Sequence, residues 1–155
     1  MSAGFNPFAG LGTAKPSTSG TYVQEGEHDF EIRTHKLVIS KKPGKVGTQI
    51  FIGEMKTLKS TVHAVGSDVS YAVNMASGDM ALRDLKAYLM GVTGFGEADV
   101  DDTIGAAAVH ASNPFRGVKV HCSAKKTEKG FVRTSWTLIE QPGDLADRIV
   151  AAAGA

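Results

Sequence analysis

The chain has 155 residues, a length that favours one domain with a core large enough to fold without a metal ion or a disulfide. Its single cysteine, Cys122, excludes an internal disulfide, and no Cys/His cluster has zinc-ligand spacing. No run approaches the ~20 apolar residues of a membrane helix. With 17 basic against 16 acidic residues, the net charge is close to neutral. The composition predicts a cytoplasmic protein with no cofactor, no metal site and no membrane partner.

The first twenty residues differ from the rest in composition. Residues 1–20 are rich in Gly, Ser, Ala and Pro, and they lack the basic start and apolar run of a secretory signal. We expect a flexible N-terminal arm over residues 1–20. A single domain is expected over residues 21–155.

Three strands are predicted in the first half of this domain. A run of β-branched and aromatic residues at 30–39 is typical of a strand, and a loop with Pro-Gly and three lysines follows it. Residues 49–60 form the second predicted strand. Residues 69–74 form the third, with Val69, Tyr71 and Val73 on one face.

The hydrophobic period then changes from two to that of a helix. Met80, Leu82, Leu85 and Leu89 recur at helical spacing, so a helix is predicted that ends at Gly91. A second short helix is expected over residues 101–111, after a loop rich in glycine and acidic residues.

Alternation returns at residues 118–125 and continues at 131–140, which predicts a hairpin with a basic turn before a final helix over residues 144–153. The predicted fold class is mainly β (α+β). Three strands, a helical insert and two further strands match the connectivity of an OB-fold-like five-stranded barrel with its insert between strands 3 and 4. A mixed α+β sandwich would give a similar pattern.

Charge is distributed unevenly along the chain. Residues 30–60 carry seven basic against two acidic side chains, and residues 113–136 carry six against one. Residues 79–102 have the opposite sign, with six acidic against two basic side chains. We expect the two basic segments to meet in the barrel as one positive concave strip that attracts a polyanion.

Binding of unpaired nucleic acid needs cations for the phosphates and flat side chains that stack on bases. Phe51, Tyr71 and Trp136 lie on predicted strands, where each is either a stacking ring or a core residue, and Phe30 and Phe131 are assigned to the core. The complete predicted nucleic-acid-binding set is Arg33, Lys36, Lys41, Lys42, Lys45, Phe51, Lys56, Tyr71, Phe115, Arg116, Lys119, Lys125, Lys126, Arg133 and Trp136.

Patterns typical of catalysis are missing from the sequence. It has no phosphate-binding loop that ends in Lys-Ser/Thr and no nucleophile elbow. Asp99, Asp101 and Asp102 lack the spacing, central glycine and closing glutamate of a calcium loop. We therefore expect a binding protein rather than an enzyme, with no catalytic residues.

Several short segments resemble the small single-stranded DNA-binding proteins of tailed bacteriophages, a divergent OB-fold group. They are Phe51-Ile52-Gly53-Glu54-Met55, Gly66-Ser67-Asp68-Val69-Ser70-Tyr71, Asp84-Leu85-Lys86-Ala87-Tyr88-Leu89 and Asn113-Pro114-Phe115-Arg116-Gly117-Val118. The resemblance covers residues 20–140. It implies sequence-tolerant binding of single-stranded DNA in phage DNA replication, recombination or repair, in the cytoplasm of a bacterial host. Partners would be replication or recombination proteins.

Two other functions compete with this reading. A structural or virion-assembly protein that self-associates through its sheet would also have an arm and an alanine-rich C-terminus, and would form a homo-oligomer. A hydrolase or nuclease is disfavoured because the acidic residues concentrate in the helical insert and not on the strands.

Overall fold

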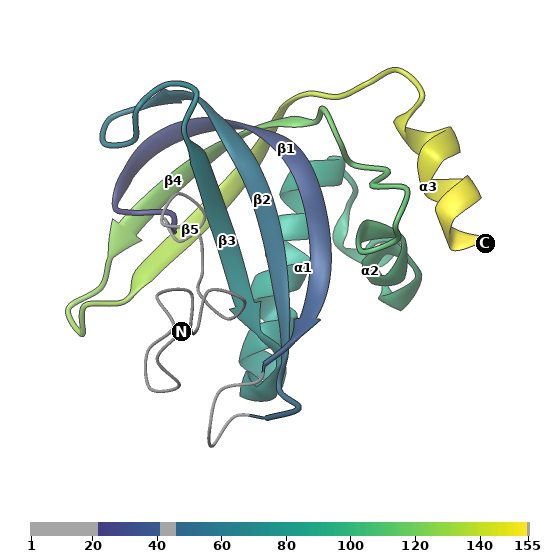
Figure 1. Cartoon of the computed structure of the whole chain (residues 1–155), viewed down its shortest axis with the longest axis horizontal. Helices are drawn as coiled ribbons and strands as arrows, with labels where there is room; N and C mark the ends of the chain where they lie inside the picture. Colours follow the sequence, from purple (N-terminus) through teal and green to yellow (C-terminus); the bar gives the residue numbers. More distant parts are fainter. Residues whose placement is uncertain (1–21, 41–45, 155) are drawn as a thin grey trace, which may run out of the picture.

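The computed structural model describes residues 22–40 and 46–154, and within these ranges five antiparallel strands form one sheet in the order β3-β2-β1-β4-β5 (Figure 1). The α+β class and the helical insert between β3 and β4 are confirmed, whereas the predicted arm at residues 1–20 lies outside the described residues. The elements are β1 (Gly26–Ile39), β2 (Gln49–Ser60), β3 (Asp68–Asn74), η2 (Met75–Ser77), α1 (Asp79–Thr93), η3 (Glu97–Asp99), α2 (Asp102–Ala108), β4 (Lys119–Lys126), β5 (Val132–Glu140) and α3 (Leu145–Ala153).

Strand β1 is the centre of the sheet because it pairs with β2 on one side and β4 on the other. Side chains of β1 alternate: Phe30 and Ile32 are buried on the inner face, which α1 covers, while the outer face is open to solvent. The pairing with β2 shifts register between Ile32 and Thr34, which leaves Arg33 as the extra residue of a bulge. After this bulge the alternation resumes with His35 buried.

The prediction that helix α1 ends at Gly91 is wrong, because the helix continues to Thr93. Gly94 ends it with φ of 73°, a left-handed conformation that glycine adopts without steric cost. Gly91 instead lies inside the helix, where a Cβ atom would be 2.5 Å from Cβ of Trp136. This glycine therefore permits close contact between α1 and β5.

The predicted barrel is not closed, since β3 and β5 are the two edges of the sheet. Three rings occupy the space between these edges: Tyr88 of α1 lies 4.9 Å from Tyr71 of β3 and 4.8 Å from Trp136 of β5, centroid to centroid. The rings of Tyr71 and Trp136 are themselves 5.0 Å apart. Side-chain packing on α1 thus replaces the backbone hydrogen bonds that closure would require.

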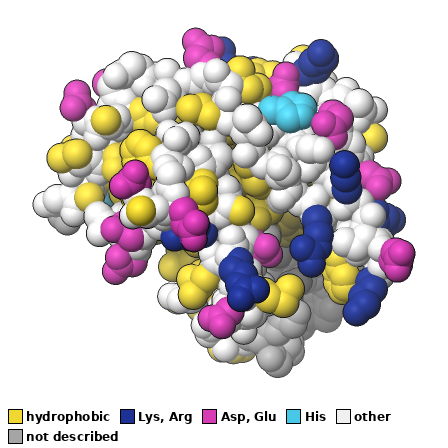
Figure 2. Space-filling view, turned by 180° about the vertical axis from the view of Figure 1, so that it is seen from behind, with side chains coloured by type: hydrophobic (Ala, Val, Ile, Leu, Met, Phe, Trp, Pro, Cys, Tyr) yellow, Lys and Arg dark blue, Asp and Glu magenta, His cyan; other side chains and the backbone are white. Residues whose placement is uncertain are grey.

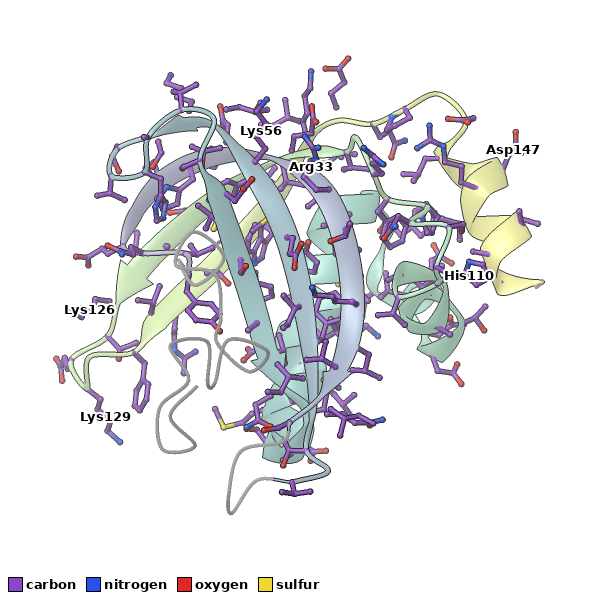
Figure 3. The ribbon with its side chains drawn as sticks, viewed as in Figure 1. Arg33, Lys56, His110, Lys126, Lys129 and Asp147 are labelled. Carbon is purple, nitrogen blue, oxygen red and sulfur yellow. The ribbon has the colours of Figure 1, made fainter. Side chains whose placement is uncertain are left out.

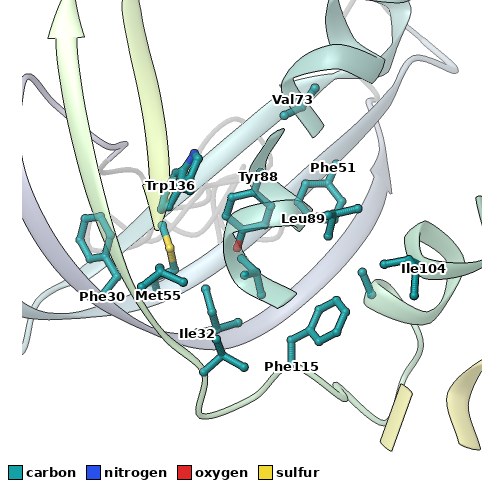
Figure 4. Close-up of a cluster of buried hydrophobic side chains, with 14 of the residues drawn as sticks. Phe30, Ile32, Phe51, Met55, Val73, Tyr88, Leu89, Ile104, Phe115 and Trp136 are labelled. Carbon is teal, nitrogen blue, oxygen red and sulfur yellow. The ribbon is translucent and has the colours of Figure 1, made fainter. Parts of the chain in front are cut away.

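Beyond α1, the short helices α2 and α3 pack against each other beside the second half of β1 (Figure 1). Ile104, Leu145 and Ile149 are buried there and extend the core that Figure 4 shows around Tyr88. Among the described residues, none of these helices combines the length and the apolar character needed to cross a bilayer.

Candidate nucleic-acid interface

Three of the predicted stacking rings belong to the core. Phe51, Phe115 and Trp136 are only 2%, 1% and 8% exposed, and Figure 4 shows all three among the buried side chains. The indole N–H of Trp136 donates to the hydroxyl of Thr134 at 2.9 Å, so its polar atom is also satisfied. A base cannot stack on these rings unless the protein opens. They position β2, β5 and the segment before β4 rather than present a ring to a ligand.

Tyr71 is half-buried and lies on the inner face of β3. One side of its ring stacks on Tyr88 at an interplanar angle of 29°. Burial raises the pKa of Tyr71 to about 12, partly opposed by its hydrogen bond with Thr134. The tyrosine therefore stays neutral, and its ring is mainly engaged with other rings of the protein.

The expected single basic strip is not formed on the outer face of the sheet. In the registers of β1 with β2 and β4, Glu31 lies opposite Lys56 and Lys119, and Asp29 lies opposite Lys59. Carboxylates of β1 therefore separate the lysines of β2 from those of β4. Arg116 of the second basic segment lines one hollow with Arg33 and Lys56 of the first, whereas Lys126 and Lys129 of the second segment lie on the hairpin between β4 and β5 (Figure 3).

Two of the predicted phosphate contacts already have carboxylate partners. Lys36 lies 2.6 Å from Glu54, and Lys119 lies 3.3 Å from Glu140. These lysines balance acidic neighbours on the outer face, so they add little to a positive surface. The predicted contacts Lys41, Lys42 and Lys45 lie outside the described residues.

The hairpin between β4 and β5 carries four cations, and the Glu25 carboxylate beside it accepts a hydrogen bond from the Lys126 backbone N–H at 3.0 Å. We call the four cations and the exposed phenylalanine ring of this hairpin the hairpin patch. Lys125 pairs directly with Arg133 across the two strands, and like charges in this position repel each other. Among the described residues, no carboxylate lies within salt-bridge distance of any of the four cations, and Glu128 is the only acidic side chain between them in the sequence. The hairpin patch consists of Lys125, Lys126, Lys129, Phe131 and Arg133.

Phe131, which the sequence assigned to the core, is 68% exposed within the hairpin patch. Its backbone is anchored on both sides: its N–H donates to the Thr127 hydroxyl at 3.2 Å, and its carbonyl accepts from the Thr127 N–H at 2.7 Å. The ring is therefore presented to solvent from a fixed turn. Its position directly after Gly130, among lysines, was the sequence signal that it belongs to a turn rather than to a buried strand.

Figure 2 shows several Lys and Arg side chains on the right of that view, on the side of the hairpin, with Asp and Glu side chains between them. Figure 3 places Lys126 and Lys129 on this hairpin, and places Arg33 and Lys56 at a different end of the sheet. Arg33 and Lys56 line a separate hollow together with Arg116. Among the described residues, Arg33, Lys56 and Arg116 thus form one group of predicted cations and Lys125, Lys126 and Arg133 another. Of these two groups, the second lies on the hairpin that also carries the exposed ring of Phe131.

His121 lies on the outer face beside the hairpin and contacts two carboxylates. Its Nδ1 is 2.7 Å from Asp29, and its Nε2 is 3.2 Å from Glu27. The hydrogen bond to Asp29, followed by that to Glu27, raises the pKa of His121. The Glu27 carboxylate also accepts a hydrogen bond from the Ser123 hydroxyl at 2.7 Å, which lowers the pKa of Glu27.

We expect Asp29→Asn to lower the pKa of His121, because the substitution removes the stronger of its two anionic partners. A raised histidine pKa stabilises the fold below the ordinary value of about 6.5, and this contribution disappears as pH rises through the folded-state pKa. Titration of the histidine ring signals by NMR measures the shift. Glu140→Gln, which removes a carboxylate that has no contact with His121, is the control; an unchanged His121 titration in Asp29→Asn would contradict the assignment.

The hairpin can attract an anion and present one ring face to it. Among the described residues, no group of three or more His, Cys, Asp or Glu side chains could hold a metal ion. No protein-family model matches the chain, and the search of curated proteins finds no match.

Proposed function

We propose that this protein binds single-stranded DNA without sequence preference, with the hairpin patch as the principal contact. The observation that carries the proposal is Phe131, an exposed ring on an anchored turn, in a hairpin whose four cations form no salt bridge among the described residues. Cations that follow the phosphates and a ring that stacks on bases are the two components of single-strand binding.

We also propose that the fold is a divergent OB-type module, which supports the proposed binding of single-stranded DNA. Its central strand β1 pairs with β2 and β4, and its helical insert follows β3, in a five-stranded sheet that is left open between β3 and β5. OB folds are partly open five-stranded barrels, and the loop between strands 4 and 5 is one of their oligonucleotide-binding loops. The hairpin patch lies on the equivalent loop of this chain.

The binding mechanism is passive. Lys125, Lys126, Lys129 and Arg133 neutralise phosphates and displace their condensed counterions, while Phe131 stacks on an unpaired base. Duplex DNA binds poorly because its bases are already stacked. We further propose that this activity serves DNA replication, recombination or repair in a bacterial host, with proteins of those processes as partners, as the resemblance of its short segments to phage proteins implies.

The test is fluorescence anisotropy with labelled single-stranded and duplex oligonucleotides at two salt concentrations. Phe131→Ala is expected to weaken binding of the single strand by about 1–3 kcal/mol, the contribution of one stacked base. The double substitution Lys126→Ala/Lys129→Ala is expected to reduce the slope of log affinity against log salt by about 1.4, since each lost phosphate contact contributes about 0.7 for single strands.

The matched control removes two exposed cations from other elements, Lys59→Ala in β2 and Arg83→Ala in α1, with the same change of net charge. Equal effects of the two double variants would mean that only net charge attracts DNA, and would contradict the hairpin patch. Absent binding together with concentration-dependent self-association in light scattering would favour the assembly protein instead.

A further inference from the structure

A hollow of about 500 Å³ opens on the outer face at the end of the sheet opposite to the hairpin patch. Three cations from three separate elements line it: Arg33 of β1, Lys56 of β2 and Arg116 of the segment before β4. The acceptors Thr34, Glu54 and Asp68 line it as well. The volume lies within the range of small-molecule sites.

Arg33 is held at the hollow by the β1 bulge. As the extra residue between Ile32 and Thr34, it has no partner position on β2, and bulges of this kind redirect side chains. The neighbouring backbone is fixed, because the Ile32 N–H donates to the Val118 carbonyl at 2.8 Å and the Ile32 carbonyl accepts from Gly117 at 2.9 Å. Both bonds also tie the Arg116 segment to β1.

Arg116 is presented by a tight turn with unusual backbone angles. Asn113 has φ of 49° and Gly117 has φ of 91°, and left-handed asparagine is uncommon outside such turns. Phe115 is buried and anchors the turn in the core, and Arg148 donates to the Arg116 carbonyl at 2.9 Å. The exposed Arg116 side chain therefore projects from a preorganised support.

The charges of the hollow suit a dianion. Glu54 is neutralised by Lys36 at 2.6 Å and accepts from the Thr34 hydroxyl at 3.2 Å. None of Arg33, Lys56 and Arg116 has a carboxylate within 4.0 Å among the described residues. Counting these three cations against Asp68 leaves a net charge of +2. A phosphomonoester carries about −1.5 to −2 at neutral pH, whereas each phosphodiester of a DNA backbone carries only one charge.

We infer that this hollow binds the phosphate of a small phosphomonoester, such as a nucleoside 5′-monophosphate, at a site separate from the hairpin patch. Arg33, Lys56 and Arg116 contact the phosphate oxygens. Asp68 accepts hydrogen bonds from hydroxyl or amino groups of the same ligand. Each phosphate of a continuous phosphodiester strand brings only one negative charge to this +2 site, so the phosphomonoester matches its charge better.

The test is NMR titration of the full chain with adenosine 5′-monophosphate, adenosine and inorganic phosphate. We expect shifts at Arg33, Lys56 and Arg116 with the nucleotide, weaker shifts with phosphate and none with adenosine. Arg116→Ala and Arg33→Ala should each weaken nucleotide binding about tenfold or more, as expected for lost charge-assisted hydrogen bonds. Lys59→Ala, an exposed lysine of the same strand β2 outside the hollow, should change it less than twofold.

Two further arms separate this site from the proposed DNA-binding function. The first arm compares an oligonucleotide with and without a 5′-phosphate. If only the phosphorylated strand changes the NMR signals of the hollow residues, a DNA end is the source of the phosphomonoester. Phe131→Ala should leave nucleotide binding unchanged. The site would be overturned if millimolar adenosine 5′-monophosphate changed no NMR signals of the hollow residues, or if Lys59→Ala and Arg116→Ala weakened nucleotide binding equally. It would also be overturned if Arg116→Ala weakened binding of the nucleotide and of unphosphorylated DNA to the same extent.

Discussion

Replacement of Gly91 by alanine is expected to lower the free energy of unfolding by about 2–3 kcal/mol, although alanine is the better helix former by about 1 kcal/mol. The added Cβ would lie 2.5 Å from Cβ of Trp136 and 2.6 Å from its carbonyl oxygen, distances that require movement of backbone as well as side chain. Helix α1 would be pushed away from β5, and the ring contact between Tyr88 and Trp136 would loosen with it.

Gly105 provides the matched control, because it also lies inside a helix, α2, but a Cβ there has no neighbour within 4 Å. Gly105→Ala should therefore stabilise the fold by up to about 1 kcal/mol. Urea denaturation of both variants gives the comparison. If the two substitutions changed stability in the same direction, the close approach of α1 and β5 would not be the reason for Gly91.

The second large effect is acid destabilisation through His35. This histidine is 4% exposed, its Nε2 lies 2.6 Å from the Tyr88 hydroxyl, and burial lowers its pKa to about 3, partly opposed by a hydrogen bond to the backbone of Ala108. In the unfolded chain the pKa returns to about 6.5. Between these values the unfolded state binds more protons, so the stability contributed by neutral His35 is complete above the unfolded pKa and is lost as pH falls.

Acidification from about pH 7 to pH 4 should therefore remove on the order of 3 kcal/mol of unfolding free energy through this group. His35→Gln keeps a polar partner for Tyr88 but cannot titrate, so it should flatten the fall in stability over this range even if it lowers stability at neutral pH. Urea denaturation at several pH values measures the slope. A His35 ring signal that titrates near its ordinary pKa in the folded protein would show that the ring is accessible and would refute this origin.

The strands were the most predictable part of the fold. The bounds of β2 agree with the predicted 49–60, because β-branched and apolar residues fill a segment bounded by turn residues. The prediction that α1 ends at Gly91 was wrong, because the sequence does not distinguish a glycine that ends a helix from one that allows a neighbouring strand to approach. Only the position of Trp136 distinguishes them.

The candidate site was less predictable, because it depends on the register between strands and on which face of the sheet is buried. Alternation places Phe51 on one face of β2, but only the position of α1 determines that this face is buried. The expected basic strip depended on which strands are neighbours. Glu31 lies inside the first basic segment and Asp29 directly before it, yet the pairing of β1 places Glu31 between Lys56 of β2 and Lys119 of β4 and Asp29 opposite Lys59.

The pairing of Lys125 with Arg133 has a consequence for how electrolyte acts on this protein. In the unbound state, dissolved ions shield the repulsion between these two neighbours and so favour the closed hairpin. The same ions compete with a polyanion for that surface. Higher ionic strength is therefore expected to stabilise the free hairpin and to weaken the proposed binding of DNA. In the proposed complex, the phosphates would reduce the repulsion between Lys125 and Arg133.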